Sequence, residues 1–329
     1  MKSQAQVFKR KKREPLIIEP MVHSRKFKNF LNICEEHIWR KVILGTPYLW
    51  MLLFFVLPFL YVIQISLTEA ADLRPPYSTM FKWIEDSSIS IRLVFDNYLV
   101  ILEDDLYIIS YLNALRVAFL ATLTCLVIGY IMAYGISQSS RKWRTILLLA
   151  VIMPFWSSFL LRVYAWMGLL GNHGILNSFL LWIGLIDEPL QIMYTNTSMF
   201  IVFVYAYLPF MVLPLYANLE KLDMTMNEAA ADLGSKPITV FLTITLPLSV
   251  PGIVAGCMLT FIPAIGEFVV PTLVGGPESL MIGRVLYNEF FGNIDWPLAS
   301  AVASLLLIVL VIPFMLFEHF NSKLETRYQ

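Results

Sequence analysis

The sequence has little charge for its length. Charged residues make up 15% of the 329 residues and hydrophobic residues 58%, and the mean hydropathy is +0.68. Soluble domains carry more charge and fewer apolar residues. The composition therefore excludes an ordinary soluble protein and places most of the chain in lipid.

Residues and motifs that support catalysis are also scarce. The three cysteines lie far apart, and the four histidines include no pair at metal-ligand spacing, so neither a disulfide framework nor a metal site is indicated. The sequence contains no GxxxxGK[ST] loop for ATP phosphates and no GxSxG nucleophile turn. The chain is therefore not expected to be an enzyme or to bind a cofactor, and any energy must come from a partner.

Long apolar runs are the dominant feature of the sequence. A bilayer core about 30 Å thick is crossed by roughly 20 apolar helical residues, since an unpaired backbone in lipid is prohibitive. Six runs are long enough to span: Ile43–Leu67, Leu115–Ile136, Ile146–Leu170, Met199–Leu219, Ile253–Val274 and Leu298–Phe317. The shorter run Ile175–Ile186 is expected to lie at the membrane surface or to re-enter it. The first run lacks a small-residue cleavage motif, so it is expected to remain as a span.

Basic residues are distributed unevenly around these runs. The tail through Lys41 carries 11 lysines and arginines, whereas the segment from Thr68 to Ser110 carries three. Lysine and arginine are enriched in cytoplasmic loops. Across all loops the tally is 18 basic residues inside and four outside. The sequence thus predicts an all-α membrane protein with six transmembrane helices and both termini in the cytoplasm.

The same tally gives the expected domain organisation. A basic cytoplasmic tail (1–41) precedes a transmembrane domain (42–320), and a short cytoplasmic tail (321–329) follows it. Within the transmembrane domain, 68–110 is an outer segment with eight acidic residues, and 220–247 is a cytoplasmic loop.

The loop between the fourth and fifth runs has the most specific pattern in the chain. The residues that carry it are Glu228, Ala229, Ala230, Gly234, Ile244, Leu246 and Pro247. A short helix is expected over Met224–Leu233, with Asn227 available near its start. Gly234 can adopt the positive φ that ends a helix, and Pro237 prevents direct continuation.

This pattern is similar to the EAA loop of permease subunits in bacterial ABC importers. The resemblance implies the type I ABC importer permease fold. It also implies that the short helix inserts into a groove on the ATP-hydrolysing subunit and transmits its motion to the membrane helices, with roles for Glu228 and Gly234. The alternative is an ordinary amphipathic loop helix.

The resemblance extends to polyamine permeases over nearly all of 43–317. The segments that carry it are Pro154–Trp156, Arg162–Trp166, Gly266–Phe268, Gly275–Pro277, Met281–Arg284, Glu289–Phe291 and Asp295–Pro297. The last three look most like the putrescine-importer permease, with spermidine permeases next. The resemblance implies an inner-membrane heterodimer of two related permeases, a dimer of ATPase subunits that use ATP and Mg, and an external polyamine-binding protein.

Glu267 is the leading candidate for a substrate-pathway residue. It is the only acid inside a predicted span, and the proline and glycine before it loosen the helix, which frees backbone carbonyls to face a cavity. Ionisable groups in a span need partners or water. An interhelical salt bridge with Arg162 or Arg116 is an equally open interpretation of Glu267.

Aromatic side chains along the third run, together with Arg162 in the same run, are further pathway candidates. Trp156, Tyr164 and Trp166 can each stack on an ammonium group, which gains about 2 kcal/mol or more over a ring when it is desolvated. Interfacial anchoring or core packing is the alternative for each of them. Putrescine and spermidine are not distinguished by the sequence.

Two other function classes fit the sequence less well than an importer permease. An ion-coupled secondary carrier is expected to show inverted repeats and paired broken helices, which the sequence does not show clearly. A membrane-embedded enzyme needs a nucleophile and base or metal ligands at membrane depth, and Glu267 with Arg162 does not make such a set.

Overall fold

The computed structural model describes residues 40–84, 88–223, 225–277 and 279–328, so almost all of the predicted basic tail lies outside the described residues. The chain divides into two compact units, Met1–Tyr61 and Val62–Gln329. The described elements are α2 (Arg40–Met51), η2 (Leu52–Val56), α3 (Leu57–Ser66), β1 (Phe81–Ile84), β2 (Ser88–Ile91), α4 (Asp96–Glu103), α5 (Asp105–Gln138), α6 (Arg141–Ile152), η3 (Met153–Trp156), α7 (Phe159–Leu170), α8 (Ile175–Trp182), α9 (Asn196–Leu219), α10 (Thr225–Asp232), α11 (Pro237–Val240), η4 (Phe241–Thr245), α12 (Leu246–Leu248), α13 (Val250–Ile265), α14 (Val269–Leu273), α15 (Ile282–Tyr287), η5 (Asn288–Gly292) and α16 (Trp296–Tyr328).

Four continuous helical segments in the described part of the chain are long and apolar enough to cross a membrane. They are Lys41–Ser66, Asp105–Gln138, Asn196–Leu219 and Trp296–Met315. These segments match the first, second, fourth and sixth predicted runs. In the first, residues 41–58 are exposed on every side. A helix that is apolar all round fits lipid or another chain as its surroundings.

The third and fifth predicted spans are not continuous helices. The segments Arg141–Trp156 and Phe159–Trp182 are bent by 94° at a break. Before this break a 3-10 turn carries Pro154, which lacks a backbone N–H, and the backbone at Ser157 is extended. The segments Pro237–Leu248 and Val250–Ile265 are likewise bent, by 63°. The 63° bend precedes the fifth predicted run, Ile253–Val274, which is itself interrupted between α13 and α14. Each bent pair still has the length and composition of one span, as six spans require.

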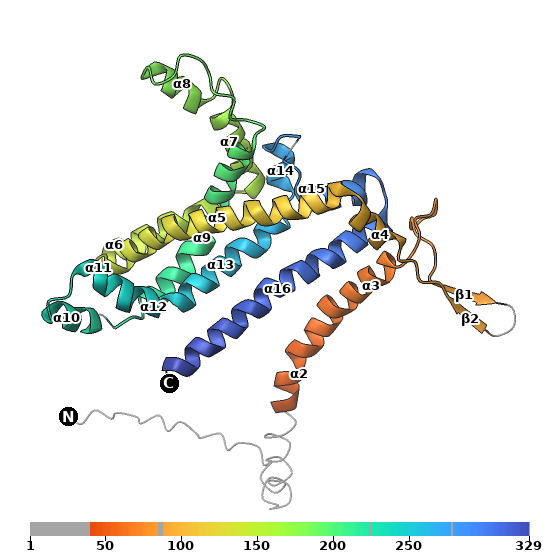
Figure 1. Cartoon of the computed structure of the whole chain (residues 1–329), viewed down its shortest axis with the longest axis horizontal. Coiled ribbons are helices and arrows are strands. Elements are labelled where there is room, and N and C mark those ends of the chain that lie inside the picture. Colours follow the sequence, from red (N-terminus) through yellow and green to blue (C-terminus); the bar gives the residue numbers. More distant parts are fainter. Residues whose placement is uncertain (1–39, 85–87, 224, 278, 329) are drawn as a thin grey trace, which may run out of the picture. The chain divides into compact units, whose positions relative to one another are not determined.

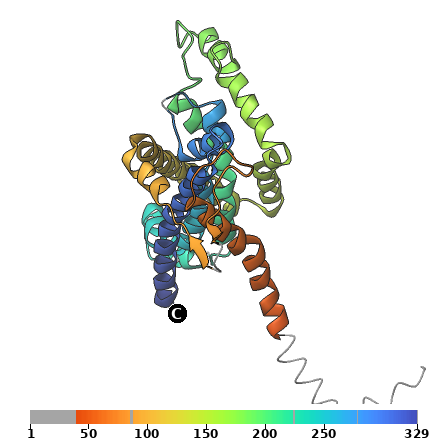
Figure 2. The same ribbon diagram turned by 90° about the vertical axis from the view of Figure 1, so that its right-hand side faces the viewer.

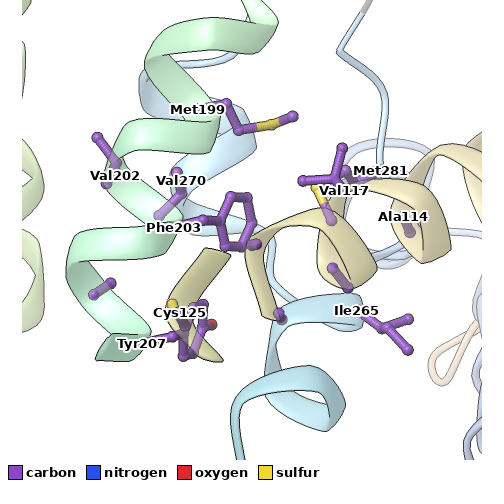
Figure 3. Close-up of a cluster of buried hydrophobic side chains, with 14 of the residues drawn as sticks. Ala114, Val117, Cys125, Met199, Val202, Phe203, Tyr207, Ile265, Val270 and Met281 are labelled. Atoms are coloured by element: carbon purple, nitrogen blue, oxygen red, sulfur yellow. The ribbon is translucent and has the colours of Figure 1, made fainter. Parts of the chain in front are cut away.

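The core lies where α5, α9 and α13 pack against one another (Figure 1). Its buried side chains include Val117 and Cys125 of α5, Phe203 of α9 and Ile265 of α13 (Figure 3). Small residues allow the close approach of these helices. A Cβ on Gly252 would lie 2.6 Å from the Asn218 side chain, and one on Gly256 would lie 2.7 Å from Met211 Sδ. This spacing of small residues is typical of helix pairs in membranes.

Shorter elements complete the unit Val62–Gln329. The chain of α7 and α8, drawn in green, leads away from it in both views (Figures 1 and 2). The predicted outer segment contains an antiparallel hairpin in which Phe81 pairs with Ile91 and Ile84 with Ser88. The all-α prediction did not include this hairpin, although the alternation from Ser88 to Ile91 is typical of a strand.

Candidate functional site

The predicted cytoplasmic helix forms as α10, and its first turn is capped by Asp223. The Thr225 backbone N–H donates to Asp223 Oδ1 over 3.0 Å. Hydrogen bonds from the backbone and then the side chain of Thr225 lower the pKa of Asp223. Asn227, expected near the start of the helix, has another contact, because its Nδ2 donates to Thr245 Oγ1 over 3.2 Å. This bond joins α10 to η4, which leads through α12 into α13.

Gly234 ends α10 as the sequence predicts. Its φ is +81°, a conformation that L side chains rarely adopt. The Gly234 N–H donates to Ala231 O over 2.9 Å, and the Ser235 N–H donates to Ala230 O over 3.1 Å. This pair of bonds is a Schellman motif, which satisfies carbonyls at the end of a helix. The second alanine of the EAA pattern, Ala230, therefore supplies the carbonyl that accepts the Ser235 N–H at the end of α10.

The loop that contains α10 presents apolar side chains to the outside. Glu228, Ala229 and Gly234 are exposed, and Leu233 is 87% exposed. Further exposed apolar residues are Met226, Ile238 and Leu242. The four remaining pattern residues are half-buried: Ala230, Ile244, and Leu246 and Pro247 of α12. Exposed apolar patches are typical of surfaces that contact another protein or a membrane.

An arginine joins the elements beside this loop. Arg144 Nη1 lies 2.9 Å from Glu220 Oε1, directly after α9, and its Nη2 donates to Ser137 O at the end of α5 over 2.6 Å. A cation near the last carbonyls of a helix is favourable. At the bend before α13, the hydroxyls of Tyr130 and Ser249 lie 2.9 Å apart. These contacts fix the helix ends on either side of α10.

Glu267 lies beyond the end of α13, in the break before α14, and is half-buried. The Tyr207 hydroxyl of α9 donates to its Oε2 over 2.7 Å. Its Oε1 accepts from the backbone N–H groups of Phe268 at 3.1 Å and Val269 at 2.8 Å. The carboxylate thus pairs amide groups that the break leaves without helical partners. Figure 3 shows Tyr207 on α9, at the edge of the buried cluster.

The structure does not pair Glu267 with either intramembrane arginine. The guanidinium of Arg162 lies 4.9 Å from the centroid of the Phe155 ring and 5.6 Å from that of Phe159. Arg116 is exposed and lines a cavity of 370 Å³ between α5 and α9. Within the described residues, neither arginine forms an ion pair. The salt-bridge interpretation of Glu267 was therefore wrong.

The aromatic candidates of the third run are not gathered around Glu267. Trp156 is 78% exposed, Tyr164 is exposed, and Trp166 makes an edge contact with Tyr205 at 5.2 Å between ring centroids. No hydrogen bond or ring contact found in the described residues joins any of the three to Glu267. Their pathway role stays a prediction.

Sequence reasoning missed the residues that the structure does place at Glu267. These are Tyr207, which donates to its carboxylate, and Gly283, whose backbone packs against the carbonyls of Gly266 and Glu267. A tyrosine within an apolar run has the same pattern as a packed aromatic residue, so no signal marked Tyr207. For Gly283, the available signal was its place in a segment that resembles polyamine permeases.

Comparisons with known proteins agree with this architecture. Residues 125–325 match the family model described as binding-protein-dependent transport system inner membrane component. The chain is 41% identical over 282 residues to the spermidine/putrescine transport system permease protein of Escherichia coli strain K12, covering 85% of this chain and 97% of that protein. The corresponding protein of Haemophilus influenzae is 34% identical over 292 residues, with 88% and 97% covered.

A solved structure of low sequence identity shares the fold. The crystal structure of a bacterial ABC transporter involved in the import of the acidic polysaccharide alginate matches with a TM-score of 0.70 at 17% identity, covering 90% of this chain and 99% of that one. Family, relatives and fold point the same way. The chain belongs to the family of binding-protein-dependent transport system inner membrane components, and it is a multi-pass, inner-membrane permease component of an ABC transporter and not the ATPase of that transporter.

Proposed function

We propose that this permease imports polyamines, with spermidine as well as putrescine among its substrates. The relatives from Escherichia coli and Haemophilus influenzae are both named for spermidine and putrescine. These names favour spermidine as a substrate. The segments that resemble the putrescine-importer permease had favoured putrescine. The alginate transporter is only 17% identical, so it supports the fold of this chain, and its acidic cargo gives no information about the substrate.

The observation that carries the proposal is the position of the Glu267 carboxylate. A polyamine in transit needs carboxylates, carbonyl oxygens and aromatic faces to replace the water around its ammonium groups. Glu267 lies at a helix break, is only half-buried and forms no ion pair within the described residues, so its charge is available to a cation. Because Tyr207 and two backbone amides hold the carboxylate, it is fixed in place before substrate arrives.

The exposed surface of α10 supports the proposed contact with the ATPase subunit. The apolar patch around Leu233 needs a partner surface, and Glu228 and Gly234 lie beside it. We place this loop and both termini in the cytoplasm, as the basic residues predict. A second related permease subunit completes the proposed pathway.

Uptake by the reconstituted transporter tests this function. Vesicles that contain the complete complex, its binding protein and internal ATP would be given radiolabelled spermidine, with putrescine, another polyamine or an uncharged polyol as competitor. Import of spermidine that putrescine inhibits and the polyol does not inhibit supports the proposal. If spermidine is not imported, or if putrescine does not compete with it, the proposal that both are substrates is refuted.

Glu267→Gln tests the carboxylate itself. Glutamine keeps an oxygen for the amides of Phe268 and Val269 but removes the charge. A hydrogen bond to a charged group contributes about 1.5 to 3 kcal/mol, so uptake per assembled complex should fall roughly 10- to 150-fold. Glu289→Gln is the matched control, because Glu289 also accepts from a tyrosine hydroxyl, that of Tyr107, but is buried. Equal uptake by the two variants would contradict the role of Glu267.

A further inference from the structure

A row of aromatic rings runs from the predicted outer side of the chain to Glu267. In order, the row consists of Trp296, Phe290, Phe291, Tyr287 and Phe268. Trp296 and Phe290 are stacked with 5.0 Å between ring centroids, and Tyr287 and Phe268 are stacked at 5.0 Å. Between these pairs, Phe290 lies 4.9 Å from Phe291, and Phe291 lies 4.9 Å from Tyr287. Each ring therefore touches the next, and the row ends one residue from Glu267.

The middle and inner rings of this row are accessible. Phe291 is 64% exposed, Phe268 40% and Tyr287 39%. Three of the rings come from the end of α15 and from the π-helix η5, which is wider than an α-helix and carries consecutive aromatic residues. Rings that served only to fill a core would be covered in the chain itself, and these are not.

Negative charge lies at both ends of the row. The outer end meets a pocket of 1050 Å³ that is lined by Asp72, Asp295 and Trp296, with Arg74 as its basic residue. At the inner end, the backbone N–H of Phe268 donates to Glu267 Oε1 over 3.1 Å. Arg284, the basic residue of α15, donates to Pro271 O over 3.3 Å. A cation would thus find a carboxylate before the row, π faces along it and a carboxylate after it.

We propose that this aromatic row is a binding track along which the ammonium groups of the substrate pass from the outer pocket to Glu267. The inference rests on the proposed polyamine function and adds the residues that conduct the cation. An ammonium group over an exposed ring face gains about 0.5 to 2 kcal/mol, depending on desolvation. Since neighbouring rings offer similar sites, a linear polyamine can move from one to the next without a deep trap.

Paired substitutions separate a cation track from apolar packing. Phe291→Leu and Tyr287→Leu keep an apolar side chain but remove the ring, whereas Phe291→Tyr and Tyr287→Phe keep the ring. A track requires that both leucine variants lose spermidine uptake about 2- to 30-fold per assembled complex and that both aromatic variants retain it. Phe179→Leu is the matched control, because Phe179 is an exposed ring on α8, outside the row.

The outcomes distinguish failure of the track from failure of the function. The experiment uses the whole complex in vesicles, with assembly and basal ATP hydrolysis measured beside uptake. If the native complex imports spermidine and the leucine variants do so equally well, the track is refuted and the polyamine function stands. If the leucine variants fail to assemble while the aromatic ones assemble, the rings contact a partner subunit and the track is refuted. If the native complex imports no polyamine, both proposals fail.

Discussion

Replacement of Gly234 by alanine should weaken the contact between this permease and its ATPase subunit. No heavy atom lies within 4 Å of a Cβ built on Gly234, so the substitution meets no steric obstacle. Its cost comes from the backbone, because an alanine held at a φ of +81° is strained by about 1 to 2 kcal/mol. That strain opposes the two Schellman bonds that end α10. The equilibrium between the binding conformation of the loop and its other conformations should shift about 5- to 30-fold toward the latter.

Titration of the purified permease complex with its ATPase subunit measures this effect. The apparent Kd for the ATPase should rise about 5- to 30-fold for Gly234→Ala, and less for Gly234→Asn, because asparagine tolerates this conformation better. Membrane insertion should be unchanged. Spermidine uptake at limiting ATPase should fall in proportion.

The chain contains a closely matched control in Gly184. It follows α8 with a φ of +71°, has open space around a built Cβ, and ends its helix with the same two bonds, from Gly184 N–H to Leu181 O and from Leu185 N–H to Leu180 O. Gly184→Ala therefore carries the same strain away from α10. An unchanged Kd for Gly234→Ala, or an equal rise for Gly184→Ala, would refute the reasoning.

Two further predictions concern the break before α14 and the start of α10. Gly283→Ala would place a Cβ 2.7 Å from the Glu267 carbonyl oxygen, so the break before α14 must shift. Uptake per complex should fall while ATPase binding stays normal. Normal uptake would show that the position of the break is not critical. Hydrogen bonds from Thr225 lower the pKa of Asp223 below its ordinary value of 3.8, so the cap stabilises α10 above that pH and is lost as pH falls through the lowered pKa. Amide exchange in α10 should be accelerated by Asp223→Ala at pH 7, whereas acidification of the native chain should accelerate it only below about pH 4; an increase already at pH 5 would contradict this assignment.

The end of α10 could be predicted because its determinants are local. A glycine after a run of helix-forming residues, followed by a proline, specifies a stop whatever surrounds it. Gly234 therefore adopts its positive φ as expected. The cap at the other end was missed, since Asp223 and Asn227 are both capping residue types, and only the position of Thr245 decides that Asn227 bonds elsewhere.

The breaks in the third and fifth spans could not be located from hydropathy. A bend frees backbone groups, and whether it is tolerated in a membrane depends on partners supplied from distant parts of the chain. At Glu267 the carboxylate pairs the freed amides, and the hydroxyl of Tyr207 on α9 holds that carboxylate. Because these residues are 60 positions apart, one sequence does not connect them.

The same separation explains the wrong prediction for the arginines. One of the two open interpretations of Glu267 paired it with Arg162 or Arg116 across helices. In the described residues, two aromatic rings pack against the Arg162 guanidinium, whose buried Nε has no hydrogen-bond partner, and hydroxyl and amide groups donate to Glu267. Both solutions use neutral groups that are common in membrane helices.

The helix α13 makes the two candidate regions parts of one lever arm. It is 16 residues long, or about 24 Å, with Ser249 at one end and the Glu267 break at the other. The hydroxyl pair of Tyr130 and Ser249 lies at the bend and would act as the fulcrum. A rotation of about 10° there, driven through α10, would displace the far end by roughly 4 Å. Because Gly252 and Gly256 pack α13 closely against α9, such a rotation requires these two helices to part, and it would then separate the Glu267 carboxylate from the Tyr207 hydroxyl of α9.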